Sequence, residues 1–309
     1  MGEHILVIGA ILLDVKGKPV AGLEPGTSNT SRIRVTRGGT ARNVAENLGR
    51  LGADVKLMSA VGDDQTGKRL IAQTAEANVD VQYVQIIEGK NTGAYMAVLE
   101  TDGSLSVAMD DVSVLEAITP GYLNQHRALF RDADMVMMDG SLSSQAMNTI
   151  VRLCNQYDVR LIADPSSTRL AERLRPFLND IFLIVPNEKE AAALCQFDVL
   201  QNDPDSMLHL ARMLVQEGVD NVIVTLSDFG IDYATSNESG YIPPNYSEMV
   251  DSTGTGDAAT AAIMYGLCNE MQPIEAIRLG AAAAGLTLQS SETAVPDLSL
   301  DMLYEHLIV

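Results

Sequence analysis

The sequence contains no tryptophan, and only 5% of its 309 residues are aromatic. Basic residues are also few: 21 Lys and Arg stand against 41 Asp and Glu, a formal net charge of −20. Extensive contact with nucleic acid or an anionic membrane requires clustered Lys and Arg, so the charge balance argues against both partners. A small anionic ligand is still allowed, because backbone amides and a bound cation can hold a phosphate in an acidic protein.

Cysteine is scarce, and no stretch is apolar over a length that could cross a bilayer. Cys154, Cys195 and Cys268 lie far apart and none belongs to a CxxC pair, so we expect reduced thiols and no disulfide or metal role. The chain begins directly on a strand-like apolar run with no basic segment before it. We therefore expect a cytoplasmic protein without a membrane anchor.

Short, continuous apolar runs alternate with helical patterns along the chain. The runs span residues 5–9, 55–62, 135–140, 159–164, 181–187 and 221–226. Such runs are typical of strands buried on both faces of a parallel sheet. Residues 41–51 and 206–218 have apolar side chains at helical spacing, and the stretch from Gly256 onward looks helical. The alternation predicts one α/β domain over residues 1–309, with a doubly wound, mostly parallel sheet flanked by helices.

Two segments break this rhythm. Residues 32–36 alternate between apolar and polar, and residues 92–111 read as a hairpin with its turn at TDGS. We expect a small β-strand lid built from about residues 15–37 and 91–111. An exposed edge of that lid could pair with a second copy of the chain to give a homodimer.

Polar residues follow the ends of several predicted strands: Asp14, Asp139, Asp164, Asn187 and Thr225. Ligands of doubly wound proteins gather at the carboxyl ends of the strands, so these residues together predict a pocket. Any one of them could instead cap the helix that follows it. The prediction therefore depends on the set.

The segment DSTGTGDAATAAIMYGL, residues 251–267, places Gly254 and Gly256 before Asp257 at the expected start of a buried helix. Glycines admit a ligand closely, and the unpaired N–H groups of a first helical turn form an anion site. An acid there would repel the anion. Asp257 is therefore either a helix cap or a base held beside a phosphate that it does not touch.

Two other segments carry similar signals. Gly38 and Gly39 precede a helix whose first turn contains Arg42 and Asn43, and an Asn amide suits a sugar hydroxyl because it both donates and accepts. A plain turn with a solvated Arg explains the same residues. In PNEKE, residues 186–190, the acids could simply complement a helix start or could order the water shell of Mg²⁺.

GGTARNVAENLGRLG, PNEKE and DSTGTGDAATAAIMYGL resemble, in order and separation, the motifs of the ribokinase-like (PfkB) family of carbohydrate and nucleoside kinases. The likeness covers nearly the whole chain and implies a ribokinase-like fold, ATP and Mg²⁺ as cofactors, and a nucleoside or sugar substrate. Residues 31–52 and 106–127 are most similar to the pseudouridine kinases. This second likeness implies transfer of phosphate to the 5′-hydroxyl of pseudouridine.

The resemblance also implies roles for individual residues. Asp257 would be the catalytic base, and the amides of Gly254, Thr255 and Gly256 would form the anion hole with its own N–H. The other implied sites are the sugar site of Asp14, Gly38, Gly39, Arg42 and Asn43, and the nucleotide site of Asn187, Thr225, Ser227 and Gly230. Glu190 would hold Mg²⁺ through water. Asp251 and Thr253 resemble ligands of a monovalent cation such as K⁺, although an Asx-type turn explains them equally well.

Two positions depart from the family pattern. Thr40 stands where ribokinases carry Lys, which makes ribose a poorer expectation, and Ser227 stands where the family has glycine near the nucleotide. Tyr95, Met109 and Asp111 are candidates for base contacts, with ordinary hairpin packing or a solvated acid as the alternative.

The sequence also allows other functions. Uridine, adenosine, inosine or ribose could be the substrate in place of pseudouridine. A nonenzymatic sensor is disfavoured by the intact Asp257 and its glycines, and a dinucleotide oxidoreductase by the absence of G-x-G-x-x-G after the first strand.

Overall fold

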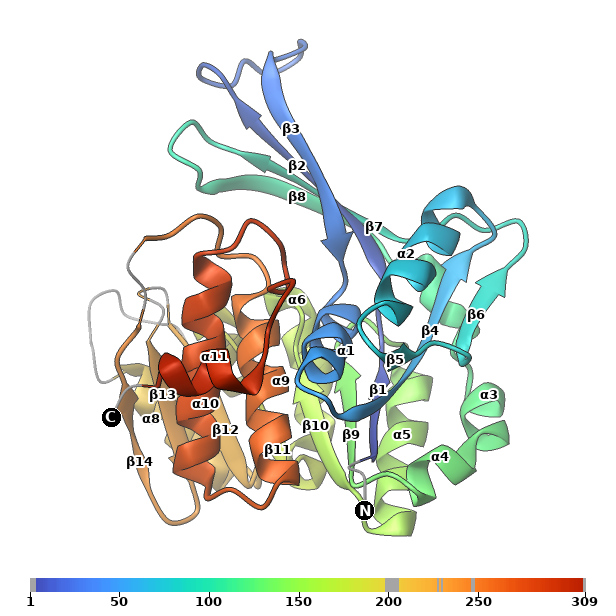
Figure 1. Ribbon diagram of the computed structural model, residues 1–309, viewed down its shortest axis with the longest axis vertical. Coiled ribbons are helices and arrows are strands. Elements are labelled where there is room, and N and C mark those ends of the chain that lie inside the picture. The colour runs from blue at the N-terminus through green and yellow to red at the C-terminus, as the bar shows by residue number, and fades with distance from the viewer. Residues whose placement is uncertain (1–3, 198–205, 227, 229, 246–247, 308–309) are drawn as a thin grey trace.

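The computed structural model describes residues 4–197, 206–226, 228, 230–245 and 248–307, and a twisted central sheet between two helical layers forms its body (Figure 1). The strands of this sheet are β1 (His4–Ile8), β4 (Asp54–Gly62), β5 (Val79–Asp80), β6 (Val84–Ile87), β9 (Met135–Asp139), β10 (Arg160–Asp164), β11 (Leu183–Ile184), β12 (Asn221–Thr225), β13 (Ile231–Thr235) and β14 (Ser239–Ile242). They run in the order β14-β13-β12-β11-β10-β9-β1-β4-β5, with β6 beside β4. The pairings from β5 to β12 are parallel, and β13 and β14 extend the sheet as antiparallel strands.

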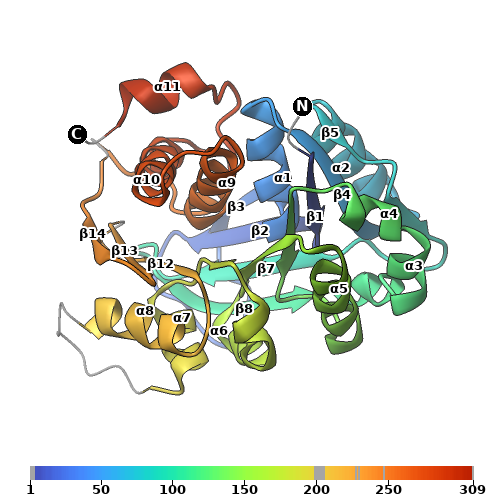
Figure 2. The same ribbon diagram turned by 90° about the horizontal axis from the view of Figure 1, so that it is seen from below.

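Helices cover both faces of the sheet (Figure 2). One face carries α1 (Thr40–Arg50), α2 (Gln65–Ala75), α9 (Thr255–Cys268) and α10 (Pro273–Leu288), with α11 (Leu300–Glu305) outside them. The other carries α3 (Pro120–Gln125), α4 (Arg127–Arg131), α5 (Ser144–Tyr157), α6 (Thr168–Ala171), α7 (Glu188–Cys195) and α8 (Ser206–Gln216), together with the 3₁₀ segments η1 (Ser113–Ala117) and η2 (Glu172–Asp180).

Alternate residues of each central strand belong to different cores. In β1, Leu6 and Ile8 pack with α3 to α8, whereas Ile5 and Val7 pack with α1, α9 and α10. This two-sided burial explains why the strands read as unbroken apolar runs and not as alternating ones. The predicted doubly wound α/β fold is confirmed.

A second sheet projects from the body at the top of Figure 1. It contains β2 (Leu12–Pro19), β3 (Ser31–Gly38), β7 (Ala94–Leu99) and β8 (Leu105–Asp111), in the order β3-β2-β7-β8. We call these four strands the projecting sheet. It is joined to the body where β1 leads into β2 and β3 leads into α1, so its base lies beside the carboxyl end of β1.

No helix in the described segments combines the length and the apolar character that crossing a bilayer requires.

Candidate active site

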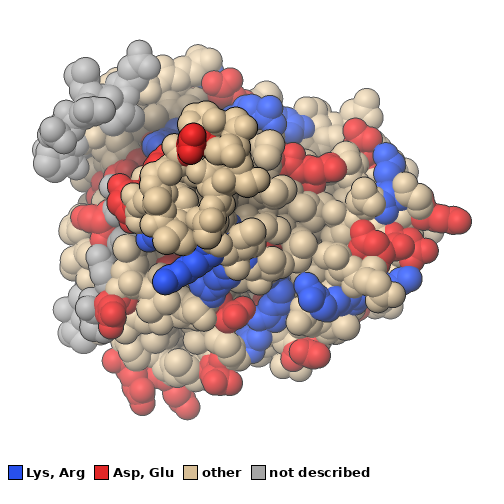
Figure 3. Space-filling view, turned by 90° about the horizontal axis from the view of Figure 1, so that it is seen from above, with Lys and Arg blue, Asp and Glu red and all other residues tan. Residues whose placement is uncertain are grey.

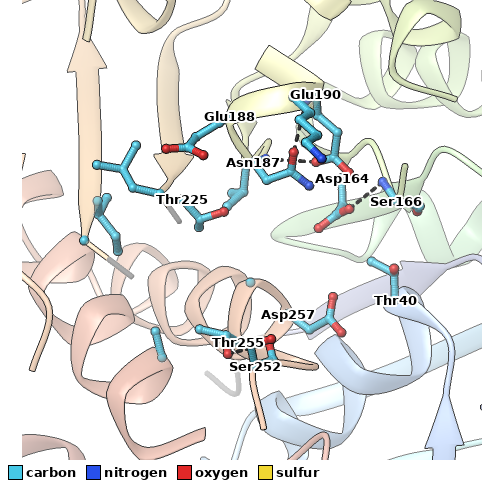
Figure 4. A pocket seen from close by; sticks show the side chains of 17 residues that line it. Thr40, Asp164, Ser166, Asn187, Glu188, Glu190, Thr225, Ser252, Thr255 and Asp257 are labelled. Carbon is cyan, nitrogen blue, oxygen red and sulfur yellow. Dashed lines mark hydrogen bonds between the residues drawn. The ribbon is translucent and has the colours of Figure 1, made fainter. Parts of the chain in front are cut away.

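A pocket of about 450 Å³ opens between the carboxyl ends of β10, β11 and β12 and the start of α9. The polar residues and glycines that line it include Thr40, Asp164, Ser166, Asn187, Glu188, Glu190, Thr225, Gly230, Ser252, Thr255, Gly256 and Asp257 (Figure 4). Asp164, Asn187 and Thr225 thus meet the glycine-rich segment at one cavity, whereas the other two strand-end residues, Asp14 and Asp139, do not line it. The Asp139 carboxylate is fully buried and accepts hydrogen bonds from Ala10 and Ser141. The cavity lies at the place where doubly wound sheets bind ligands.

Helix α9 begins at the pocket without a side-chain cap. Its N-cap residue, Gly254, has φ 82°, a left-handed conformation in which a side chain would also collide with the Thr293 carbonyl. The N–H of Thr255 lies 3.4 Å from the Ser252 carbonyl, whereas those of Gly256 and Asp257 find no acceptor within the described part of the chain. The first turn of α9 therefore presents free donors and a positive dipole end to the cavity.

The Asp257 carboxylate points into the pocket from this first turn (Figure 4). Its Oδ2 accepts a 2.5 Å hydrogen bond from the Asn43 amide, and the Asn43 oxygen in turn accepts from Arg42. Burial raises the pKa of Asp257 to about 6, against the lowering effects of Asn43 and Arg42. A carboxylate with this pKa is ionised at neutral pH and is a better proton acceptor than an exposed one.

Arg42 does not reach the cavity, contrary to the expectation that it binds the sugar. It is fully buried, and its guanidinium donates to Glu46, Asn43, Thr293 and two backbone carbonyls. Glu46, which sequence reasoning did not single out, is fully buried too and also accepts from Arg50. Arg42 therefore holds Asn43 in place, and Asn43 orients Asp257.

Asp14 lies on β2 at the base of the projecting sheet and is 6% exposed. No described residue donates a hydrogen bond to its carboxylate, so its oxygens are available to a ligand. Burial raises the pKa of Asp14 to about 6, and the charges of Lys16 and Arg42 act in the opposite direction. The Asp14 charge is near enough to Asp257 to raise the pKa of that residue.

Gly38 and Gly39 serve this arrangement through packing. A side chain at Gly38 would collide with the Asp14 carboxylate, and one at Gly39, where φ is 94°, would collide with the Ala10 carbonyl. The close approach that these glycines allow is thus to the protein itself. They set Asp14 and the start of α1 in position.

Helix α7 begins on the opposite wall of the pocket with a capping box. Asn187 Oδ1 accepts from the Glu190 N–H at 3.0 Å, and Glu190 Oε2 accepts from the Asn187 N–H at 2.9 Å. Asn187 and Glu190 cap the helix and also line the pocket, so capping does not remove them from reach of a ligand. Burial raises the pKa of Glu190 to about 7.

Three carboxylates face one another across the cavity: Asp164, Glu190 and Asp257 (Figure 4). Burial and the charges of Asp257 and Glu190 raise the pKa of Asp164 well above its ordinary value. The sequence placed Asp164 at a strand end without giving it a role. In the described part of the chain no three acidic, His or Cys side chains form a cluster able to cage a metal. The pair Asp164 and Glu190 nevertheless suits Mg²⁺, which keeps most of its waters and uses one or two carboxylates with substrate phosphates.

Of the predicted nucleotide-binding residues, Thr225 and Gly230 line the pocket together with Asn187. Thr225 ends β12, and its N–H donates to the Pro186 carbonyl at 2.9 Å. Gly230 packs against Tyr241, to which a Cβ would approach within 2.6 Å. Asp228 does not line the pocket, and its carboxylate accepts from the Gly230 N–H and from the Tyr241 hydroxyl. Ser227 lies outside the described residues.

Asp251 and Thr253, expected to hold a monovalent cation, are bonded within the protein. Thr253 N–H and Oγ1 donate to Asp251 Oδ1 at 2.9 and 2.7 Å, which is the Asx-type turn. The Lys16 ammonium contacts both Asp251 oxygens and Thr253 Oγ1. Although burial opposes it, these bonds hold the pKa of Asp251 below its ordinary value. The oxygens that a cation would use are therefore occupied by a side chain.

The three candidates for base contacts separate onto two faces of the projecting sheet. Tyr95 pairs with Asp14 in the strand register and faces the same side, where its pKa is raised by burial and by Asp14. Met109 pairs with Met96 on the opposite face, and Asp111 is exposed and caps Ser113. Of the three, Tyr95 alone shares the face of Asp14. Asp110 pairs with Tyr95 on the neighbouring strand, and the sequence analysis did not include it among the candidates for base contacts.

The doubly wound sheet, the uncapped helix start and the carboxylate beside it fit a site for phosphoryl transfer. A family model described as pfkB family carbohydrate kinase matches residues 3–299, and the chain belongs to that family. It is 31% identical over 299 residues to the pseudouridine kinase of Escherichia coli (strain K12), covering 96% of this chain and 94% of that protein.

Two further comparisons show how broad this kinship is. The chain is 28% identical over 303 residues to the guanosine-inosine kinase of Exiguobacterium acetylicum, covering 97% of this chain and 99% of that one. The structure of Arabidopsis thaliana ribokinase complexed with ribose and ATP matches with a TM-score of 0.81, covering 98% and 99% of the two chains. At 21% sequence identity, this similarity shows only that the two chains share a fold. The protein is thus a kinase of the family, and the comparisons leave its substrate open.

Proposed function

We propose that the protein transfers the γ-phosphoryl group of ATP to the 5′-hydroxyl of pseudouridine. The observation that carries the proposal is the pairing at the start of α9 of an oriented carboxylate, Asp257, with free backbone donors at Gly256 and Asp257. The choice of pseudouridine rests on the 31% identity to the Escherichia coli enzyme and on the sequence resemblance of residues 31–52 and 106–127.

The carboxylate of Asp257 acts as the general base. It accepts the proton of the 5′-hydroxyl as the oxygen attacks the γ-phosphorus, the new P–O bond forms, and the bond to the β-phosphate oxygen breaks so that ADP leaves. Asn43 and Arg42 hold the carboxylate in the orientation that this requires. The hydroxyl faces the side chain, and the phosphoryl group faces the amides.

The N–H groups at the start of α9 stabilise the charge that develops on the transferred phosphoryl oxygens. Because they are fixed by the helix and by Gly254, they need no reorganisation during the reaction. When bound, Mg²⁺ neutralises phosphate charge, and Glu190 with Asp164 would hold it directly or through water. The mutual repulsion of these buried carboxylates favours a cation between them.

The ribose is bound at the base of the projecting sheet, which acts as a lid. One carboxylate can accept from two hydroxyls, so Asp14 suits the ribose diol. Tyr95 lies next to Asp14 on the same face and is placed to contact the base. Thr225, Gly230 and Asn187 line the nucleotide side of the pocket.

A substrate panel tests the proposal. Coupled ADP-release assays on pseudouridine, uridine, guanosine, inosine, adenosine and ribose should give the highest kcat/KM for pseudouridine. A clear preference for another nucleoside would overturn the substrate assignment and leave the kinase assignment intact. Absence of ADP release with the whole panel would count against both.

We also propose that the protein forms a homodimer through the projecting sheet. The face turned away from Asp14 exposes Ile33, Val35, Met96, Val107 and Met109, an apolar surface of a kind that monomers seldom expose. Seen from above, uncharged side chains cover much of the projecting part, with Asp and Glu among them (Figure 3). Light scattering should give a dimer mass, and Val107→Glu should give a monomer.

A further inference from the structure

The ammonium group of Lys16 occupies an unusual position. Lys16 lies on β2 of the projecting sheet, but its Nζ is 3.1 and 3.3 Å from the two Asp251 oxygens and also contacts Thr253 Oγ1. The contact joins segments 235 residues apart and is largely sheltered, with side-chain exposures of 16% for Lys16 and 22% for Asp251. Arg34, beside Lys16 on β3, adds a longer contact of 3.4 Å to Asp251.

The segment that Lys16 holds leads directly into the anion hole. Asp251 and Thr253 precede Gly254, the residue whose left-handed backbone starts α9. Their side-chain oxygens form a small set of acceptors that a monovalent cation would otherwise satisfy. An ammonium group is itself a compact monovalent cation with three donors, and each of the three oxygens here is within its reach.

We propose that Lys16 is a built-in cation for the loop that carries the anion hole, so that the kinase works without K⁺. The inference rests on the proposed phosphotransfer at α9. Lys16 acts as a positioning residue: it fixes the Asp251–Thr253 turn, and the turn fixes the free N–H groups. Because Asp14 lies two residues before Lys16 on the same face of β2, the same side chain also ties the sugar-binding strand to the phosphate-binding loop.

The first test measures kinase activity with K⁺ replaced by tetramethylammonium at equal ionic strength. Wild-type protein should have the same kcat in both salts. Lys16→Met should lose about tenfold or more in kcat without K⁺, because it leaves Asp251 without its close partner, and KCl should restore part of the loss. Lys16→Arg keeps the charge and should stay independent of K⁺. Lys18→Met is the matched control, since Lys18 lies on the same strand and face but is exposed, and it should behave as wild type.

The second test follows thermal unfolding and needs no activity. K⁺ should raise the Tm of Lys16→Met more than tetramethylammonium does, and it should have no such specific effect on wild-type protein. Dependence of wild-type kcat on K⁺, or K⁺-independent full activity of Lys16→Met, would overturn the inference. Should Lys16→Met fail to fold, the response of wild-type kcat and Tm to K⁺ still decides. Should no substrate be phosphorylated, the Tm comparison decides alone, so failure of the proposed function is distinguishable.

Discussion

Helices α7 and α9 both begin at the pocket, but their first turns are finished in opposite ways. Helix α7 has a capping box in which Asn187 and Glu190 satisfy each other's backbone N–H groups. Helix α9 begins after Gly254 with no side-chain cap, and the N–H groups of Gly256 and Asp257 find no acceptor within the described chain. In a capped helix start the backbone N–H groups are bonded within the protein, whereas in an uncapped start they are available to an anion. The carboxylates follow the same division: Glu190 closes its helix, and Asp257 faces outward from its own.

The most severe way to break this comparison is to neutralise the acid on the open helix. Asp257→Asn should lower kcat by about 10²-fold or more, because the 5′-hydroxyl loses its proton acceptor. ATP binding should persist, since the backbone donors are unchanged. Turnover of the variant at the wild-type rate would exclude Asp257 as the base.

The pH dependence of wild type and Asp257→Asn also tests whether Asp257 is the general base. Since burial raises the pKa of Asp257 to about 6, kcat/KM should fall as the pH drops below about 6 and the base is protonated. A raised pKa means that the folded state disfavours the charged form, so the ionised acid destabilises the fold at high pH. Asp257→Asn should therefore have a higher Tm than wild type at about pH 8, an advantage that disappears below about pH 4. Asp14, Asp164, Glu190 and Arg42 also face this region, and a profile unchanged in Asp257→Asn would assign the titration to one of them.

The two glycines at the open helix start should respond differently to alanine. Gly254→Ala forces a side chain into a left-handed position against the Thr293 carbonyl, so both Tm and kcat should fall, the latter about tenfold. At Gly256 an added Cβ meets no atom within 4 Å, and Gly256→Ala should keep the wild-type Tm. Its kcat should fall through crowding of the phosphoryl group. Equal losses of Tm in both variants would contradict this reading of α9.

The smallest effects are expected at the start of α7, where two substitutions distinguish helix capping from Mg²⁺ binding. Asn187→Ala removes the cap of α7 and should lower the free energy of unfolding by about 1 kcal/mol. Glu190→Gln can still complete a capping box, so it should keep the Tm and raise the Mg²⁺ concentration needed for half-maximal activity severalfold. If Glu190→Gln lost stability without changing the response to Mg²⁺, Glu190 would have a capping role only.

The α/β architecture could be predicted from the sequence, because local sequence patterns specify its strands and helices. The unbroken run MVMMD in β9 could be interpreted without coordinates, since a strand covered on both faces needs apolar residues at every position. The antiparallel strands β13 and β14 were not predicted, because their sequences, IDYAT and SGYI, are short and contain polar residues or glycine. The segment of Gly254, Gly256 and Asp257 was also readable, because a helix start and its cap are set within a few residues.

The contacts of individual side chains could not be predicted from the sequence in the same way. Arg42 looked like a sugar ligand because it stands in the first turn of α1, yet it is buried against Glu46 and Thr293. Met109 and Tyr95 lie in one predicted hairpin, but the register decides which of them shares the face of Asp14. A register shift of one residue would exchange the two faces, and sequence alone does not fix it here.

The chain by itself determined that an α/β sheet would form, that a helix would begin within residues 254–257, and that an acid would stand at that start, because each depends on residues close in sequence. Tertiary structure alone decided that Asn43 orients Asp257 and that Lys16 meets Asp251, since these contacts join positions 214 and 235 residues apart. Which long-range pairs meet depends on how the crossovers pack, and no local pattern records that geometry.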